Sequence, residues 1–224
     1  MPRVCVFDVN ETLLDLAALD PAFARIFGDA TLRKTWFTQL LQSALVATVT
    51  NVYTDFGSIG IAALEMIAAR QRVTLTEENR QQIRDGMQHL PPHPEVKKSL
   101  GRLRAAGLRM AALTNSTAKV AEAQLSNAGL TSYFEQILSA DTVKRLKPAP
   151  EPYHMATQRV GVGINDIRLI AAHSWDIAGA LRAGCAAAFV ARPGMVLDPL
   201  VEKPDVIGSN LEEVTDQILA HESA

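Results

Sequence analysis

The feature that most constrains the fold is an alternation of short apolar runs with helical patterns, which continues from residue 93 to residue 221. Three of the helical patterns end at a glycine, the residue found most often just beyond a helix C-terminus. A further run, Val4–Val9, is apolar and rich in β-branched residues, which is typical of a central strand in a parallel sheet. The sequence therefore predicts an α/β chain with a doubly wound parallel sheet. The expected strands are Val4–Val9, Arg109–Leu113, Gln136–Leu138, Arg168–Ala172 and Ala186–Val190, and the expected helices between and after them are Glu95–Ala106, Thr117–Ala128, Glu151–Val160, Asp176–Ala183 and Leu211–His221.

A stretch after the first strand interrupts this alternation. Residues 16–88 contain no convincing strand, but they hold helical stripes over Thr35–Thr54, Ile59–Arg72 and Glu77–Gln88. The prolines of Leu90–Pro94 cannot continue a helix and indicate a hinge. We predict an all-helical cap of residues 16–92, inserted into a core domain of residues 1–15 and 93–224.

Composition narrows the classes of protein to which the chain can belong. Lys and Arg (22) nearly balance Asp and Glu (24), so no positive field attracts nucleic acid. At 48% hydrophobic residues the chain can bury a core and is not disordered. Cys5 and Cys185 lie in apolar runs, which favours buried thiols in a reducing compartment such as the cytoplasm.

Residues 35–54 carry no formal charge over a length that would span a membrane. Ten of these twenty residues are Thr, Ser, Gln, Asn or Tyr, and the apolar ones form a helical stripe. This pattern predicts a buried amphipathic helix rather than a membrane segment. No signal peptide is expected either, because Asp8 and Glu11 interrupt the first apolar run.

Chemically useful side chains follow the first two strands at their carboxyl ends, where open α/β sheets bind ligands. Asp8 can be kept ionised by N–H groups of the following turn, so it is a candidate nucleophile or only the residue that orders the turn. Thr114, Asn115 and Ser116 suit an oxyanion, carboxylate or halide. Capping of the next helix would explain one of these three residues.

Two later strand ends offer further candidates. Lys147 lies in a loop stiffened by prolines. The stiff loop either aims the Lys147 ammonium at a fixed point or leaves it solvated. Tyr153 follows in the same loop or in the first helical turn. His173 is a candidate general base or a hydrogen-bonded loop histidine. Asp176 begins a helix, where the macrodipole by itself favours an acidic residue.

In this order the strand-end residues resemble the haloacid dehalogenase superfamily, which has a Rossmann-like core, a helical cap and an aspartate nucleophile. The matching segments are FDVNETLLD, LTNS, LKPAPEPY and AAHSWDIAGA. Two spacings, Lys147-Pro-x-x-x-x-Tyr153 and the Trp-Asp-x-x-Gly-Ala run that starts at Trp175, are most similar to type II (L-2-haloacid) dehalogenases. The resemblance implies a Rossmann-like, doubly wound sheet with an inserted all-helical cap.

The resemblance also implies a reaction: metal-independent, cofactor-free hydrolysis of small L-2-haloacids through an aspartyl ester on Asp8, giving a 2-hydroxy acid. Lys147 would keep Asp8 ionised, Thr12 would orient it, and Asp176 would anchor Lys147 or the hydrolytic water. His173 is expected to act as the base for ester hydrolysis. Thr114 is expected to hold the substrate carboxylate and Asn115 to help cradle the halide. The full expected substrate-binding set is Val9, Asn10, Phe37, Thr114, Asn115, Tyr153 and Ser174.

Four positions depart from the type II pattern. Phe37 stands where a cap arginine would receive the halide, so either another group such as Arg33 replaces it or the substrate differs. His173 stands in place of an asparagine, Ala171 in place of a serine, and Asn10 in place of an aromatic residue.

Two alternative functions remain open. A magnesium-dependent phosphatase of the superfamily would have acids where this chain has Asn10 and Ala172. The absence of the cap arginine would also agree with a non-catalytic protein that binds a small ligand. We expect a small halogenated carboxylic acid as partner, with no nucleic acid and no membrane. A homodimer would use the apolar stripe of the cap.

Overall fold

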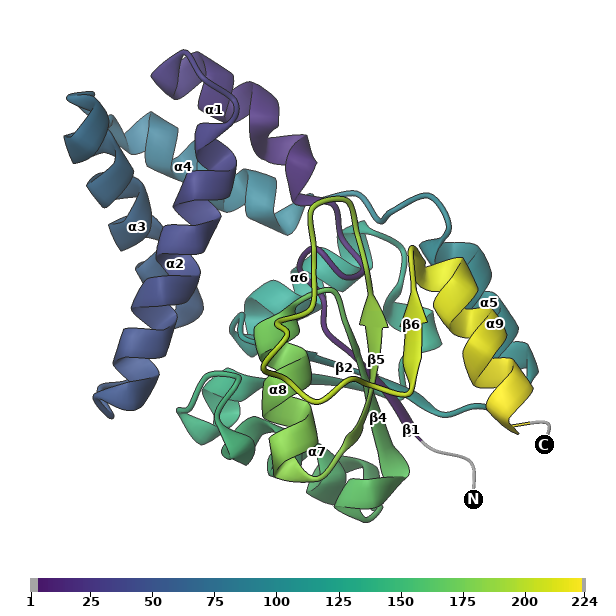
Figure 1. Cartoon of the computed structure of the whole chain (residues 1–224). Coiled ribbons are helices and arrows are strands. Elements are labelled where there is room, and N and C mark those ends of the chain that lie inside the picture. Colours follow the sequence, from purple (N-terminus) through teal and green to yellow (C-terminus); the bar gives the residue numbers. More distant parts are fainter. Residues whose placement is uncertain (1–3, 223–224) are drawn as a thin grey trace.

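The computed structural model describes residues 4–222, and its centre is a parallel sheet in the strand order β3-β2-β1-β4-β5-β6 (Figure 1). Each neighbouring pair is parallel, and this order is that of a Rossmann sheet. The predicted fold class is therefore confirmed. The strands are β1 (Val4–Phe7), β2 (Met110–Thr114), β3 (Gln136–Ser139), β4 (Ile167–Ala171), β5 (Ala186–Val190) and β6 (Val206–Gly208).

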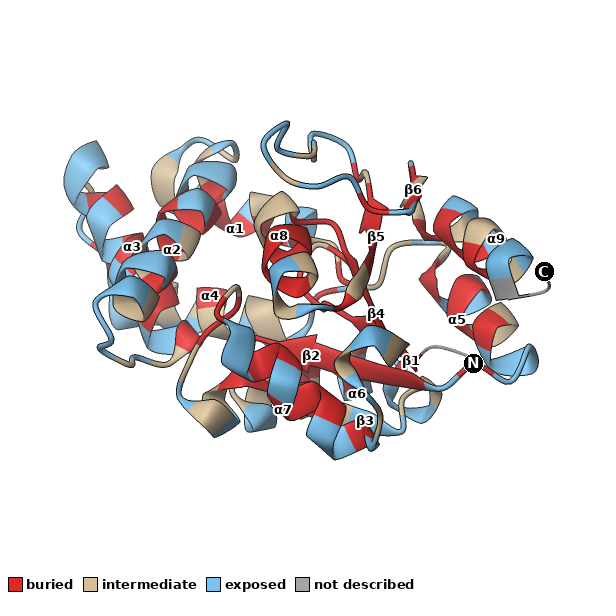
Figure 2. Cartoon of the chain, turned by 60° about the horizontal axis from the view of Figure 1, so that its bottom comes forward, coloured by how far each residue is buried: buried red, intermediate tan, exposed pale blue. Residues whose placement is uncertain are grey.

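Helices cover both faces of the sheet, as expected for a doubly wound fold. Along β1, Cys5 and Phe7 belong to the apolar cluster that contains α5 (Val96–Ala105), α6 (Ala118–Asn127) and α9 (Leu211–Glu222). Val4 and Val6 point the opposite way, into the cluster that contains α7 (Pro150–Val160) and α8 (Ser174–Ala183). In Figure 2 the central strands are buried along their length, whereas the helices are buried on one side.

The cap helices form a separate group beyond the carboxyl ends of the strands (Figure 1). They are α1 (Asp20–Phe27), α2 (Leu32–Val49), α3 (Phe56–Gln71) and α4 (Glu77–Gln88). The indole N–H of Trp36 donates to the Gly60 carbonyl oxygen at 2.8 Å. A Cβ on Gly60 would lie 3.2 Å from the side chain of Leu40, so glycine allows α2 and α3 to approach closely.

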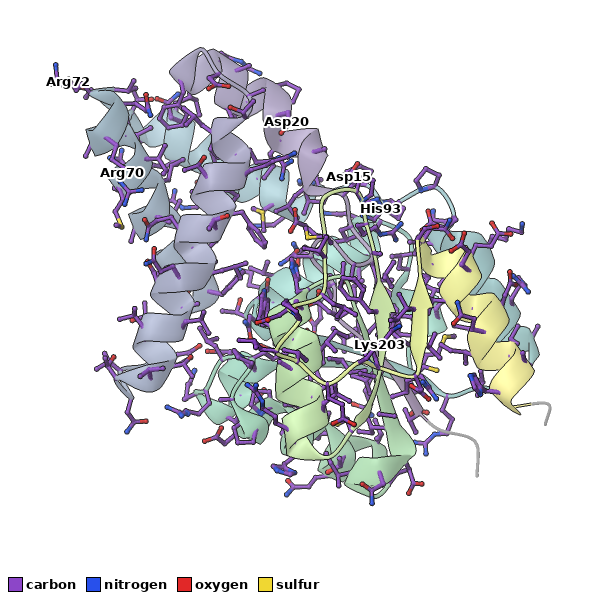
Figure 3. The ribbon with its side chains drawn as sticks, in the orientation of Figure 1. Asp15, Asp20, Arg70, Arg72, His93 and Lys203 are labelled. Carbon is purple, nitrogen blue, oxygen red and sulfur yellow. The ribbon has the colours of Figure 1, made fainter. Side chains whose placement is uncertain are left out.

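Two short segments join the cap to the core and lie side by side. The Asp15 N–H donates to the Pro91 carbonyl oxygen at 2.8 Å, and the His93 N–H donates to the Leu13 carbonyl oxygen at 3.0 Å. Figure 3 shows Asp15 and His93 at this junction. The predicted proline hinge thus runs beside the segment that leaves β1.

Two elements differ from the prediction. Helix α1 was not predicted, although Pro21 at its first turn and Gly28 after its end, at φ 76°, are ordinary helix boundaries. Strand β6 was missed because three residues carry too little periodicity to be recognised. The uncharged residues 35–54 lie largely in α2, and no helix within residues 4–222 is long and apolar enough to cross a membrane. Cys5 and Cys185 are both buried, as predicted.

Candidate active site

Asp8 lies immediately beyond β1 and is buried beneath the cap. Its backbone N–H donates to the Ile170 carbonyl oxygen at 3.0 Å, so pairing with β4 fixes the position of its Cα. Its carboxylate accepts two hydrogen bonds, from Thr12 Oγ1 to Oδ2 at 2.6 Å and from Lys147 Nζ to Oδ1 at 2.9 Å. The side chain is therefore held in one orientation at the strand tip.

Lys147 connects Asp8 to a second carboxylate. Its Nζ donates to Asp176 Oδ2 at 2.6 Å and to the Leu113 carbonyl oxygen at 2.9 Å, in addition to Asp8. An ammonium has three N–H donors, so all of them are used. Burial alone would lower the pKa of Lys147, but the carboxylates of Asp176 and Asp8 outweigh it and raise that pKa above its usual range.

The two carboxylates on Lys147 have pKa values displaced in opposite directions. Burial acts to raise the pKa of Asp8, but Lys147, His173 and Thr12 together hold it below its usual value. Burial and the nearby Asp8 charge raise the pKa of Asp176 in spite of Lys147. Two neighbouring acids with separated pKa values can take different roles, and Asp8 is the one whose surroundings favour the ionised form more strongly.

Tyr153 supports Asp176 from below. Its hydroxyl donates to Asp176 Oδ1 at 2.5 Å, and burial, followed by the Asp176 charge, raises the pKa of Tyr153 well above 10. The chain needs a glycine at position 179, since a Cβ there would lie 2.5 Å from the Tyr153 hydroxyl and 2.6 Å from Pro148 Cβ. The close packing of α8 against the Lys147 loop thus fixes Asp176, one of the two acid partners of the lysine.

The polar residues after β2 fix the lysine loop. Asn115 Oδ1 accepts from the Lys147 backbone N–H at 2.8 Å, and its Nδ2 donates to the Lys147 carbonyl oxygen at 3.3 Å. Thr114 Oγ1 accepts from the Ser116 N–H at 3.2 Å. Helix α6 begins after Thr117, whose side chain makes no capping hydrogen bond. Helix capping therefore does not account for this cluster.

A small cavity of about 10 Å³, enough for about one water molecule, lies over Asp8. The cap covers it with apolar side chains only, while the core side carries the polar ones. The lining residues are Phe37, Leu41 and Phe56 from the cap, and Asp8, Asn10, Thr114, Asn115, His173 and Trp175 from the core. The cap is closed in this structure, so these side chains must part to admit a carboxylic acid.

A family model described as "haloacid dehalogenase-like hydrolase" matches residues 2–184. The chain belongs to this family. It is 26% identical over 214 residues to (S)-2-haloacid dehalogenase 2 of Pseudomonas sp. strain CBS-3, covering 95% of this chain and 93% of that protein. It is 28% identical to (S)-2-haloacid dehalogenase H-109 of Pseudomonas putida, covering 96% of both chains.

The fold agrees with these relationships. The structure of L-2-haloacid dehalogenase from Xanthobacter autotrophicus with chloropropionic acid covalently bound superposes with a TM-score of 0.92, 23% sequence identity and full coverage of both chains. The predicted superfamily, its type II branch and its hydrolase class are confirmed by the relatives and the fold together.

Most of the predicted site of this dehalogenase-like hydrolase comes together around Asp8. Six of the predicted residues do not line the cavity: Thr12 bonds to Asp8, Asp176 bonds to Lys147, and the other four lie as follows. Val9 is fully buried, Tyr153 lies beneath Asp176, and Lys147 lies below the cavity between its carboxylates. Ser174 accepts from the Asp198 N–H at 2.8 Å, which turns its hydroxyl toward a different surface hollow.

Arg33 does not replace the missing cap guanidinium in this hydrolase. Its Nε donates to Asp20 Oδ1 at 2.5 Å, its Nη1 lies 3.6 Å from Glu11 Oε1, and it does not line the cavity. Glu11 also lies 3.6 Å from His173 Nε2 through its other oxygen. A chain of polar side chains thus runs from Asp20 through Arg33 and Glu11 to His173.

Four residues near the cavity were not predicted as site residues. Glu11 and Trp175 lie within the matched motifs, so the sequence places them near the site but does not indicate which contacts they make. Leu41 and Phe56 lie on cap helices, where an apolar stripe gives no sign of which residues face the core.

No group of three or more His, Cys, Asp or Glu side chains within residues 4–222 is arranged to hold a metal ion. Asp8 and Asp176 both bind the Lys147 ammonium.

Proposed function

We propose that this chain hydrolyses the carbon–halogen bond of small (S)-2-haloacids, with Asp8 as nucleophile and without a metal ion. The observation that carries the proposal is the ionised Asp8 carboxylate, bonded to Thr12 and Lys147, under an apolar cap. Relatives that align with nearly the whole chain are named (S)-2-haloacid dehalogenases.

In the first step, Asp8 attacks C2 of the acid from the side opposite the halogen. A carbon–oxygen bond forms, the carbon–halogen bond breaks, and the halide leaves with the bonding electron pair. Lys147 keeps the attacking carboxylate ionised, since its charge lies 2.9 Å away in a buried site. Thr114 and the amides of the turn after β1 are the groups we assign to the substrate carboxylate.

In the second step, water attacks the carbonyl carbon of the Asp8 ester. The bond from that carbon to the ester oxygen breaks, which frees the 2-hydroxy acid and restores Asp8. Asp176 holds Lys147 in place, and its raised pKa also suits it to accept the proton of the water. Exclusion of bulk water by the cap strengthens these charge interactions.

A phosphatase of the same superfamily fits the residues less well. Asn10 is an amide whose oxygen accepts from Gln124 Nε2 at 3.0 Å, and an amide N–H is too weakly acidic to serve as a general acid. Position 172 is an alanine. Neither position therefore supplies one of the additional carboxylates that magnesium prefers as ligands.

We further propose that residues 16–92 act as the cap over a core of residues 1–15 and 93–224, and that the protein is a cytoplasmic homodimer. The second half of α2 exposes Val46 and Val49, Val52 just beyond the helix is exposed too, and Val49 is 84% exposed. An apolar patch of this kind favours an interface. Sedimentation analysis is expected to show a dimer for the wild type and a monomer for Val49→Glu, and a monomeric wild type would contradict the proposal.

Chloride release from L-2-chloropropionate, measured with and without EDTA, tests the proposed function. We expect one chloride and one D-2-hydroxypropionate per substrate, unchanged by EDTA, and no release by Asp8→Asn. In a single turnover in ¹⁸O-labelled water, the label should enter the Asp8 carboxylate before it enters product. Equal release by wild type and Asp8→Asn over a panel of haloacids would disprove the proposal.

A further inference from the structure

The loop that follows β1 is held at three consecutive residues by side chains from distant parts of the chain. Each contact is a hydrogen bond from a side-chain N–H: Gln124 Nε2 to Asn10 Oδ1 at 3.0 Å, His93 Nε2 to the Glu11 carbonyl oxygen at 3.0 Å, and Arg192 Nη2 to the Thr12 carbonyl oxygen at 2.8 Å. Glu11 has a φ of 61°, in the left-handed region that residues other than glycine disfavour. The surrounding structure must therefore enforce the shape of this loop.

Thr12 is the residue through which this loop reaches the Asp8 carboxylate. Its Oγ1 donates to Asp8 Oδ2 at 2.6 Å and accepts from the Ala172 N–H at 2.9 Å. A hydroxyl has one proton, so the Ala172 contact leaves that proton free for Asp8. Thr12 is fully buried, and no water molecule of the bulk solvent can replace its contacts. The direction of its O–H bond therefore depends on where the Thr12 backbone is held.

Arg192 holds that backbone from across the edge of the sheet. It follows β5, which β4 separates from β1. Its own N–H donates to the Val190 carbonyl oxygen at 2.8 Å, so its Cα is fixed at the strand end. Its Nη1 pairs with Glu95 Oε1, which also accepts from the Leu211 N–H at 3.1 Å. The guanidinium is thus anchored by Glu95 on one side and donates to Thr12 on the other.

Stability alone is a weak reason for an arginine at this place. Arg192 is 6% exposed, and its Nε is buried without a hydrogen-bond partner among residues 4–222. Burial lowers the pKa of Arg192, and the carboxylates of Glu95 and Asp15 only partly oppose this. A buried ion pair of this kind is often no more stabilising than apolar side chains of similar volume. The contact with Thr12 supplies a reason that stability does not.

We propose that Arg192 is a positioning residue for the nucleophile, because its hydrogen bond to the Thr12 carbonyl oxygen keeps the Thr12 hydroxyl directed at Asp8 Oδ2. The proposal rests on the proposed function, since it concerns the same nucleophile. Arg192 does not line the cavity over Asp8 and touches no substrate. With Thr12 on Oδ2 and Lys147 on Oδ1, the carboxylate keeps one orientation. Without Arg192, Thr12 turns away and Asp8 loses one of these two bonds.

A double-mutant cycle on kcat tests this relationship. Arg192→Met and Thr12→Val are each expected to lower kcat about tenfold or more with little change in KM, because the loss affects the attack rather than binding. The protein with both substitutions should be about as slow as Thr12→Val alone. If Arg192 acted independently of the Thr12 hydroxyl, the two losses would multiply. Multiplied losses would overturn the proposal.

The pH profile of kcat/KM is a readout that loss of stability alone would not move. The Thr12 hydroxyl is one of the groups that hold the pKa of Asp8 low. Activity needs the ionised carboxylate, so it falls as pH decreases through that pKa. Arg192→Met should therefore move the acid limb to higher pH, in the same direction as Thr12→Val. An acid limb that stays in place in Arg192→Met would overturn the proposal.

Arg168→Met is the matched control. Arg168 is another buried arginine, near the amino end of β4, which pairs with Asp205 and donates to the Ala187 carbonyl oxygen at 3.4 Å. Its loss should lower stability without changing kcat or the acid limb. An equal fall in kcat in Arg168→Met would show that any lost buried arginine slows the reaction, and would overturn the proposal.

A second variant keeps the test usable if Arg192→Met does not fold. That substitution leaves the Glu95 carboxylate without its counter-charge. Arg192→Met combined with Glu95→Gln removes both charges, so no buried ion is left unpaired. The combined variant should fold and show the same loss of kcat. A folded combined variant with the kcat of the wild type would contradict the role of Arg192.

The Thr12 hydroxyl proton gives a readout that needs no substrate. In NMR spectra of threonine-labelled protein, a buried and bonded hydroxyl proton exchanges slowly with water. We expect this signal in the wild type and Arg168→Met, and its loss in Arg192→Met. That loss without turnover of any haloacid would support the role of Arg192 and reject the proposed function. Turnover with the signal and kcat both unchanged in Arg192→Met would do the reverse.

Discussion

Lys147 and Asp8 form a fully enclosed ion pair, with Nζ 2.9 Å from Oδ1, in which the same ammonium also holds Asp176 at 2.6 Å. Removing this cation would leave two buried carboxylates without a counter-charge. Breaking a buried pair from one side costs about 3–5 kcal/mol. The lysine is therefore a structural requirement, as well as the group that we propose keeps Asp8 ionised.

Lys147→Met is expected to lower the free energy of unfolding at pH 7 by about 3–5 kcal/mol and kcat by about 100- to 1,000-fold. The loss of stability should shrink below pH 5, because the stranded carboxylates then take up protons. Urea denaturation across pH measures this. Lys144→Met is the matched control: Lys144 makes an exposed ion pair with Asp141, so its loss should cost less than about 1 kcal/mol. Equal effects of the two variants would contradict the prediction.

Gly179→Ala should damage the site without touching a charged residue. The new Cβ would lie 2.5 Å from the Tyr153 hydroxyl and 2.8 Å from the Pro148 carbonyl oxygen. We expect a loss of about 1–3 kcal/mol of stability and a lower kcat, because the Tyr153–Asp176 bond must shift.

Gly101→Ala in α5 is the control for that substitution, since nothing lies within 4 Å of its Cβ position. It should gain about 0.5–1 kcal/mol by reducing the entropy lost on folding, with unchanged kcat. Thermal unfolding and steady-state kinetics of both variants distinguish crowding from a general effect of alanine. A stable, fully active Gly179→Ala protein would show that Tyr153 need not be held there.

Several of these relationships follow from sequence and several do not. The order of Asp8, Thr114, Lys147 and Asp176 predicts the site, because parallel strands bring their carboxyl ends to one edge. The hydrogen bond between Tyr153 and Asp176 is consistent with the Lys147-Pro-x-x-x-x-Tyr153 spacing and the run that starts at Trp175. The rotation of Arg33 toward Asp20 and the hydrogen bond that turns Ser174 toward Asp198 are not predictable in this way. Both depend on side-chain packing between segments far apart in the sequence.

Glu11→Gln should stabilise the protein at neutral pH. Burial raises the pKa of Glu11 above its usual value, in spite of His173 and Arg33. For an acid with a raised folded pKa, the stability contribution is present below the unfolded pKa of about 4.3 and is lost as pH rises through the folded pKa. At pH 7 the ionised Glu11 therefore costs stability, which a neutral amide avoids.

The measurement is the free energy of unfolding of wild type and Glu11→Gln from pH 4 to pH 8. The variant should be more stable at pH 7, and the difference should vanish toward pH 4. Glu213→Gln, an exposed carboxylate whose pKa its hydrogen bonds with Ser209 lower, should show the opposite sign. A Glu11→Gln protein that is less stable at pH 7 would mean that its ion pairs outweigh its burial.

Phe56 separates the small cavity over Asp8 from a larger pocket of about 590 Å³ among α2, α3, α4 and the start of α6, since it lines both. Phe56→Ala should therefore open a path for longer acyl chains. We expect kcat/KM for 2-bromohexanoate to rise relative to 2-bromopropionate by about tenfold, at a cost of about 3–5 kcal/mol in stability. Phe23→Ala, which removes a buried cap ring that lines neither the cavity nor the larger pocket, should cost similar stability without changing the preference. If both variants shift chain-length preference equally, looseness of the whole cap, rather than the removal of this partition, sets substrate size.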